Sequence, residues 1–232
     1  MNSMSFRALS EAPSRIPALI ILLFTLICGH AWAEDTAWEL KQDKKGIAVS
    51  TRSVEGSAVK EFKGEMLVDN SLGAIVALLD NPEAGPEWIY NCESITRVET
   101  NSESQTTWNH VINKLPWPAG DRDLVVRSDM TQSPETYDVL IALKAEPELL
   151  PEVPGKVRIQ KMKASWQLSP QKDGQVKVTY QAHIEPGGSL PNWLVNSLLV
   201  DTPYKSLSAM RELLSEDQYK TQSHPDIVEP NS

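Results

Sequence analysis

The polar residues that could carry out chemistry inside this 232-residue chain are few, and they lie in segments that alternate between apolar and polar positions. Alternation puts Ser128, Tyr137 and Tyr180 on apolar faces, and His110 shares the parity of Trp108. An acid, base or nucleophile in a shielded site could support hydrolysis or elimination. A lone inward histidine, however, is more often a hydrogen-bonded core residue than a catalyst.

Motifs for catalysis or cofactor binding are absent from the sequence. It has no Gly-x-Ser-x-Gly elbow, no glycine-rich phosphate loop and no histidines and carboxylates at metal-ligand spacing. We therefore predict no catalytic residue, no metal site and no cofactor.

The charged triplet Asp121-Arg122-Asp123 has two interpretations. It is either a solvated turn whose charges pair locally, or a site where Arg122 makes a bidentate contact to a phosphate or carboxylate. Arg122 is therefore the candidate for binding the head group of a ligand.

The N-terminus has the pattern of a secretory signal peptide. Arg7 and Arg15 precede an apolar run over residues 18–28, and Ala31-Trp32-Ala33 provides a small-x-small cleavage site. The apolar run is too short for a membrane-spanning helix, which needs about 20 residues. We expect cleavage of residues 1–33 and export to a bacterial periplasm.

The chain that remains after cleavage has 199 residues, enough for one domain with a sizeable core. Its single cysteine, Cys92, excludes an intramolecular disulfide. With 20 basic and 30 acidic residues its net charge is −10, which argues against nucleic acid as a partner and against electrostatic anchoring on an anionic membrane. We expect a monomer with one domain over residues 34–215, a disordered polar tail over 216–232, and only transient, apolar membrane contact.

Most of the chain is predicted to form one antiparallel sheet with a single buried face, because apolar and polar residues alternate along it. A turn at Gly46 joins two short strands into a hairpin. A helix is predicted over residues 72–79, with a further helical turn over 86–90. Later strands are predicted over residues 59–68, 94–99, 106–113, 123–130, 137–144, 157–168 and 176–184.

The sequence then predicts one long amphipathic helix, with Ser189 as its N-cap and Pro191 in its first turn. Its apolar residues recur at helical spacing, so one face must pack against the sheet. On this pattern alone the helix either completes a solid core or closes a cavity beneath a curved sheet.

Three spaced segments resemble START domains, and together they cover about residues 38–214. They are Trp38-x-Leu40 with Gly46-Ile47-x-Val49-x-x-Arg52, Pro116-Trp117-Pro118-x-x-x-Arg122-Asp123, and Leu190-Pro191-x-Trp193-Leu194-Val195-Asn196 followed by Thr202-Pro203. The resemblance implies an α+β helix-grip fold, in which a curved antiparallel sheet wraps around the long C-terminal helix and encloses a cavity. START domains bind sterols, phospholipids or ceramides and usually move them without a cofactor.

The resemblance and strand parity together give the candidate site residues. Loops 115–120 and 146–155 are similar to those that gate the START cavity, so Trp117, Leu149 and Leu150 are candidates for membrane contact. Pro203 interrupts the last helix and could act as its hinge during ligand entry. The candidate cavity residues are Trp88, Trp108, His110, Val126, Ser128, Tyr137, Tyr180, Trp193, Ser197 and Leu198.

The sequence departs from the START pattern at the polar anchor of the cavity. Many lipid- and sterol-binding members carry an inward arginine about six places beyond the equivalent of Arg122, paired with a buried acid. Ser128 occupies the arginine's place here, and the acid's place falls at residues 109–110.

These features favour a protein that binds a hydrophobic lipid (phospholipid, sterol-like or fatty acyl) in an internal cavity and transfers it between membranes without catalysis. An alternative is a helix-grip enzyme of the cyclase or aromatase type, which would use His110, Tyr137 and Tyr180 on a hydrophobic substrate. A third hypothesis is a partner-binding module with a solid core and no cavity.

Overall fold

The computed structural model describes residues 37–230 apart from Pro118. The predicted signal peptide, residues 1–33, lies outside the described residues. Within the described part of the chain, no helix is long and apolar enough to cross a membrane.

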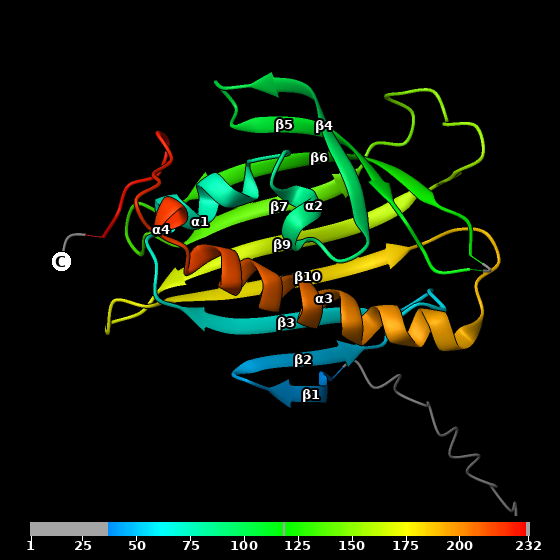
Figure 1. The fold of residues 1–232 in the computed structure, drawn as a ribbon, viewed down its shortest axis with the longest axis horizontal. Coiled ribbons are helices and arrows are strands. Elements are labelled where there is room, and N and C mark those ends of the chain that lie inside the picture. The colour runs from blue at the N-terminus through cyan, green and yellow to red at the C-terminus, as the bar shows by residue number, and fades with distance from the viewer. Residues whose placement is uncertain (1–36, 118, 231–232) are drawn as a thin grey trace, which may run out of the picture. The chain divides into compact units, whose positions relative to one another are not determined.

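One antiparallel sheet organises the domain, with its strands in the order β1-β2-β3-β10-β9-β7-β6-β5-β4 (Figure 1). The last strand, β10, inserts beside β3 and so joins the N-terminal hairpin and third strand to the rest of the sheet. A short strand, β8, pairs in parallel with β6. The strands are β1 (Glu39–Lys44), β2 (Ile47–Arg52), β3 (Glu61–Val68), β4 (Cys92–Asn101), β5 (Thr106–Asn113), β6 (Arg122–Gln132), β7 (Val139–Ala145), β8 (Val157–Arg158), β9 (Lys161–Pro170) and β10 (Val176–Glu185).

The helices α1, α2 and α3 lie on the same face of this sheet (Figure 1). The long helix α3 packs against β2 and β3, and α1 and α2 lie over the strands on the other side of β10 (Figure 1). The curved antiparallel sheet holding a long C-terminal helix confirms the predicted helix-grip fold. The helices are α1 (Leu72–Leu79), α2 (Gly85–Trp88), α3 (Asn192–Leu214) and α4 (Asp217–Lys220).

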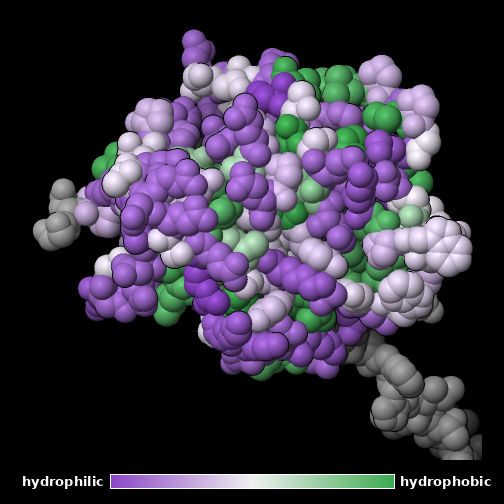
Figure 2. Space-filling view, in the orientation of Figure 1, coloured by the Kyte–Doolittle hydropathy of each residue, from purple (hydrophilic) through white to green (hydrophobic). Residues whose placement is uncertain are grey.

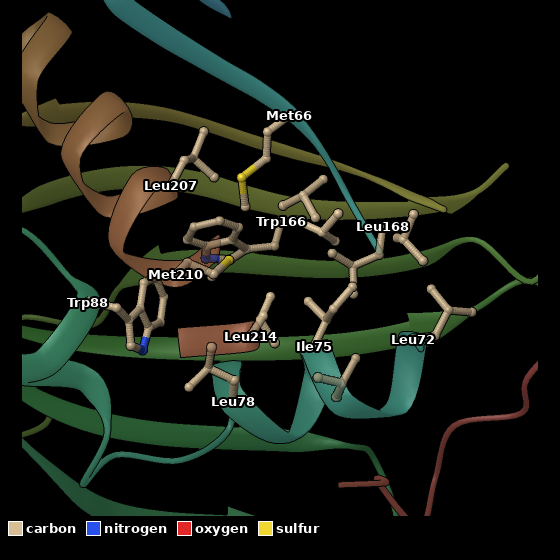
Figure 3. Packing of buried hydrophobic residues seen from close by; sticks show 14 of the residues in the cluster. Met66, Leu72, Ile75, Leu78, Trp88, Trp166, Leu168, Leu207, Met210 and Leu214 are labelled. Carbon is tan, nitrogen blue, oxygen red and sulfur yellow. The ribbon is translucent and has the colours of Figure 1, made fainter. Parts of the chain in front are cut away.

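A continuous apolar core lies between the sheet and the C-terminal half of α3 (Figure 3). Leu207 and Met210 of α3 are fully buried in it. Trp88 meets Trp166 edge to face at 5.6 Å between ring centroids, and Trp166 stacks on Tyr180 at 4.0 Å. Truncating a buried leucine to alanine typically costs about 2–5 kcal/mol, so these contacts hold this half of the helix firmly against the sheet.

Strand alternation separates an inner apolar face from an outer polar face, as the sequence predicts. In β7, Val139 and Ile141 are buried whereas Leu140 is exposed. In β10, Val176 and Val178 are buried. Figure 2 shows that the face of the domain seen in Figure 1 is largely hydrophilic, with hydrophobic residues confined to small patches.

Two predicted boundaries are wrong. The strand predicted over residues 157–168 is divided into β8 and β9, because β8 leaves the main path of the sheet to pair with β6. Helix α3 begins after Pro191, which makes no side-chain cap hydrogen bond, rather than at a Ser189 cap. Gly187 and Gly188 have positive φ, so the chain turns sharply before it reaches the helix.

The C-terminal segment 216–230 is packed against the domain, so the prediction of a disordered tail is wrong for these residues. Tyr219 is buried, and Ile227 packs against the core. The Glu229 carboxylate accepts hydrogen bonds from the backbone N–H groups of Leu72 and Gly73, at 3.1 and 2.7 Å, at the start of α1. A carboxylate at a helix N-terminus is stabilising, and polar composition alone does not reveal such a contact.

Candidate functional site

A cavity of about 260 Å³ lies between the inner face of the sheet and the N-terminal half of α3. Its wall is mainly apolar and comes from strands β3 to β7, β9 and β10, from helices α1 and α3, and from the segment around α2. The apolar strand residues that line it include Val111, Val126, Leu143 and Met162. Residues that are far apart in the sequence therefore build one partly enclosed, mainly apolar surface.

Helix α3 has two parts with different surroundings. Val195, Leu198 and Leu199, in the first part, line the cavity. Leu207 and Met210, in the second part, are buried in the core. Pro203 lies inside the helix between these parts. A proline removes one helical hydrogen bond, so the helix is weakest at this junction.

A few uncharged polar groups interrupt the apolar wall. Asn109 and Ser128 line the cavity from β5 and β6, and within the described residues Asn109 Oδ1 is buried without a hydrogen-bond partner. Tyr180 also lines the cavity, and burial raises its pKa to about 12. The Tyr180 phenol therefore keeps its proton at neutral pH. These groups can hydrogen-bond to a neutral group of a ligand, but they cannot balance a charge.

Arg122 lies at the end of the cavity where β6 begins, and its residue is only 2% exposed. Its guanidinium donates to the carbonyl oxygens of Pro186 (3.2 Å), Gly187 (3.0 Å) and Gly120. It thus joins the loop before β6 to the loop before α3. Burial lowers the pKa of Arg122, and the charge of Asp121 opposes that shift.

A second buried arginine, Arg158, holds the proline-rich loop over residues 146–155. Its guanidinium donates to Asp123 Oδ2 at 2.6 and 2.9 Å and to the carbonyl oxygens of Pro147, Leu150 and Pro151. The His110 Nε2 atom lies 3.1 Å from the same carboxylate oxygen. Burial alone would raise the pKa of Asp123, but the hydrogen bonds and charges of Arg158 and His110 outweigh it and lower that pKa.

A smaller cavity of about 120 Å³ adjoins the first. The two share Leu79, Asn109, Ser128 and Leu143 as a common wall. His224 and Asp226 of the C-terminal segment line the far side of the smaller cavity. The packed tail therefore closes this end of the interior.

Five of the ten predicted cavity residues lie in the cavity wall, together with the head-group candidate Arg122. The five come from α2, β6, β10 and α3, and they are Trp88, Val126, Ser128, Tyr180 and Leu198. Whether they contact a ligand stays a prediction.

The other five predicted cavity residues lie elsewhere. Trp108 and His110 are on the outer face of β5, where Trp108 lies against Arg127 with the guanidinium carbon 5.6 Å from its ring centroid, and His110 binds Asp123. Tyr137 precedes β7 with a positive φ of 60° and packs on the main core. Trp193 is 59% exposed, and Ser197 donates to Asp201 on the helix surface.

The three candidates for membrane contact are on the loops where they were predicted. Trp117 is 89% exposed, and Leu149 is also exposed. Leu150 is partly buried, and its carbonyl oxygen binds Arg158. Loops 115–120 and 146–155 thus carry two exposed apolar side chains.

The register between β5 and β6 shows which face of β5 points into the cavity, and parity within the β5 sequence alone does not. Asn109 pairs with Val126 and Val111 with Leu124, and paired residues share a face, so the odd-numbered residues of β5 point inward. Asn109 and Val111 could therefore have been identified from the inward faces of β6 once the register was known. Arg158 had no such signal, because its partner Asp123 is 35 residues away in the sequence.

The fold and the site define a helix-grip domain with a mainly apolar cavity. The family model for the START domain matches residues 29–218, and the chain belongs to this family. The resemblance noted in the sequence is thereby confirmed.

Known proteins agree with this assignment. A STAR-related lipid transfer protein from Xanthomonas axonopodis, solved as fragment 25–204, is 34% identical; the match covers 77% of this chain and 99% of that chain, with a TM-score of 0.71. An uncharacterized protein of Pseudomonas aeruginosa is 35% identical over 185 residues, which cover 80% of this chain and 89% of the relative. The human phosphatidylcholine transfer protein is 26% identical over 165 residues, which cover 68% and 75%.

Proposed function

We propose that this protein binds a lipid with its acyl portion inside the cavity and carries it between membranes. The observation that carries the proposal is the partly enclosed, mainly apolar cavity between α3 and the sheet in a member of the START family. The names of its relatives from Xanthomonas axonopodis and human, a lipid transfer protein and a phosphatidylcholine transfer protein, support the same activity.

Extraction of a lipid requires a cavity of this kind. Removing an acyl chain from a bilayer forfeits about 0.8 kcal/mol per methylene, or roughly 13 kcal/mol for a 16-carbon chain. A mainly apolar wall closed by α3 can offset that loss because it keeps the chain away from water.

We infer that part of helix α3 moves when a large ligand enters. The cavity of about 260 Å³ is slightly smaller than the roughly 300–1,000 Å³ of typical ligand sites, so a two-chain lipid would need the walls to separate. The part of α3 after Pro203 is anchored by Leu207, Met210 and a hydrogen bond from the Tyr90 N–H to the Ser206 hydroxyl at 3.0 Å. We therefore assign the opening motion to the part before Pro203.

Membrane contact is assigned to the loop end of the domain. The exposed side chains of Trp117 and Leu149 are suited to entering the interfacial region of a bilayer. The net charge favours release from an anionic surface after exchange. On the N-terminal sequence pattern, we place this activity in the periplasm.

The enzyme alternative is less well supported by the geometry. His110 and Tyr137 are outside the cavity wall, so of the three proposed reactive groups only Tyr180 faces a ligand. The raised pKa of Tyr180 keeps it neutral, which suits hydrogen bonding rather than base catalysis.

Two measurements test the proposed function. Native mass spectrometry of the protein purified without detergent should show one bound lipid per chain. Incubation of the delipidated protein with vesicles containing a fluorescent phosphatidylcholine should accelerate transfer to acceptor vesicles. A protein that carries no lipid and leaves the transfer rate at its spontaneous value would refute the proposal.

A further inference from the structure

We propose that Arg122 is an anion-binding subsite of the cavity, so that the protein selects amphiphiles whose head carries a carboxylate or a phosphate. The inference rests on the proposed lipid-binding function and names the chemical class of its ligand. It requires that Arg122 be buried, lie on the cavity wall and have no directly bound carboxylate.

Arg122 forms no ion pair among the described residues, and the charge of Asp121 offsets that of Arg122 only in part. Its three described partners are backbone carbonyl oxygens, which carry only partial negative charge. Both acidic residues adjacent in sequence have other partners: Asp121 is bound to Lys156 at 3.1 Å and Asp123 to Arg158 at 2.6 Å. The cavity wall contains no aspartate or glutamate among the described residues. A buried charge without a partner is unfavourable, and an anionic ligand would supply the partner.

Other cations near the cavity do have a carboxylate partner, in contrast to Arg122. Arg158 is buried to a similar extent, but it faces the fully buried carboxylate of Asp123. Lys60 also lines the cavity, but its side chain is 44% exposed and lies 3.9 Å from Glu39. Solvent and a carboxylate thus offset the charge of Lys60. Arg122 is therefore the cation on the described cavity wall that most needs an anion.

The polarity of the cavity gives the ligand a direction. At the Arg122 end, its cross-strand partner Asn113 and the nearby Asn91 also line the wall. Farther along β6 the wall becomes apolar at Leu124 and Val126. An amphiphile would therefore place its head beside the loops and its chain between the sheet and α3.

Donor capacity remains available on the guanidinium. An arginine has five N–H donors, and the three described hydrogen bonds use three of them. The two remaining donors can accommodate one anionic oxygen group. Because Arg122 also joins the loops before β6 and α3, such a ligand would bind where those loops meet.

Dodecanoate, dodecyl phosphate and dodecanol have carbon chains of the same length but different head groups. Comparing them separates the effect of head-group charge on affinity from the effect of burying the carbon chain. Their affinities are measured by displacement of diphenylhexatriene, an uncharged apolar dye, from the delipidated full-length protein. The wild type should bind an anionic probe roughly 10- to 100-fold more tightly than dodecanol, the range expected for a charge-assisted hydrogen bond. If dodecanoate binds more tightly than dodecyl phosphate, the preferred head group is the carboxylate of a fatty acid. If dodecyl phosphate binds more tightly, the preferred head group is a phosphate.

Arg122→Gln should remove this preference, so that the ratio of anion affinity to dodecanol affinity falls to about one. Arg122→Lys should retain part of the preference because it keeps the charge, and it decides the question if the glutamine variant does not fold. Arg127→Gln is the matched control, since Arg127 is on the same strand but binds Asp129 outside the cavity wall. No preference in the wild type, or an unchanged preference in Arg122→Gln, overturns the inference. Failure of both the dye and all three probes to bind would instead refute the proposed lipid-binding function.

Discussion

Leu207 of α3 lies directly over Gly64 of β3, so closely that a Cβ atom added to Gly64 would be 2.7 Å from Leu207 Cδ1. The same Cβ atom would lie 3.0 Å from Pro203 Cβ. A glycine in β3 therefore lets the long helix approach the sheet at the point where its cavity-lining part ends and its anchored part begins.

Gly64→Ala should destabilise the protein by about 1–3 kcal/mol, the usual effect of overpacking a core. Leu207 is fully buried and Pro203 is rigid, so neither can move aside easily. The free energy of unfolding in urea measures the effect. Gly120→Ala is the control, because a Cβ there meets nothing within 4 Å. Equal stability of the two variants would contradict the close packing of α3 on β3.

Arg158→Met should cost about 3–5 kcal/mol, because it leaves the buried carboxylate of Asp123 without its guanidinium. It should also release the loop over residues 146–155, whose carbonyl oxygens Arg158 binds. Unfolding in urea at neutral pH gives the loss of stability. Arg127→Met is the control, because its pair with Asp129 is about one-third exposed and such pairs are worth about 0–1 kcal/mol. An effect no larger than that of the control would show that Arg158 does not hold the loop.

Lowering the pH should reduce the difference in the free energy of unfolding between the wild type and Arg158→Met. The folded pKa of Asp123 is lowered, so the stability that its ion pair provides is complete above the unfolded pKa of about 3.9 and is lost as the pH falls through the folded pKa. In the variant, burial without the guanidinium raises the pKa of Asp123, so protonation relieves the penalty. Urea unfolding at several pH values between neutral and about 3 should therefore show converging stabilities, whereas a constant difference would exclude Asp123 as the linked group.

Glu229→Gln should destabilise the protein by roughly 0.5–2 kcal/mol, because it removes the charge that the N–H groups of Leu72 and Gly73 bind at the start of α1. Hydrogen exchange of the α1 amides should become faster as the C-terminal segment loosens. Asp217→Asn is the control, since the Asp217 side chain is almost fully exposed. Unchanged exchange in α1 would indicate that the segment contributes nothing to its stability.

The two parts of α3 should differ in their dynamics. Amides of residues 194–202 should exchange with deuterium faster than those of residues 204–214, because the second part is fixed by Leu207, Met210 and Leu214 in the core. Loading with a lipid should slow exchange in the first part. Uniform exchange along α3 would contradict a hinge at Pro203.

Strand alternation predicted a one-sided antiparallel sheet and the inner faces of β6, β7 and β10, because a half-buried strand alternates over its whole length. The helix-grip fold followed from the resemblance to START domains. The pattern failed for β5. Trp108 and Ile112 are apolar on one face and Val111 on the other, so only the pairing of Asn109 with Val126 decides which face is inside. Trp193 was misplaced for a similar reason, since a single apolar residue on a helix can remain exposed.

The electrostatic features could be predicted less well than the fold. Arg122 was a candidate from its local sequence, but its burial depends on carbonyl oxygens more than 60 residues away in the chain. The Arg158–Asp123 pair and the Glu229 contact with α1 likewise join distant segments. Composition and periodicity carry no information about such pairings.

The most direct test of the account is to fill the cavity and measure lipid binding by native mass spectrometry. Leu143→Trp places an indole in the common wall of the two cavities, whereas Leu140→Trp places it on the exposed face of the same strand. We predict one lipid per chain for the wild type and Leu140→Trp, and loss of most of that lipid in Leu143→Trp at comparable folded stability. Equal lipid occupancy in all three proteins would contradict the claim that the ligand lies between α3 and the sheet.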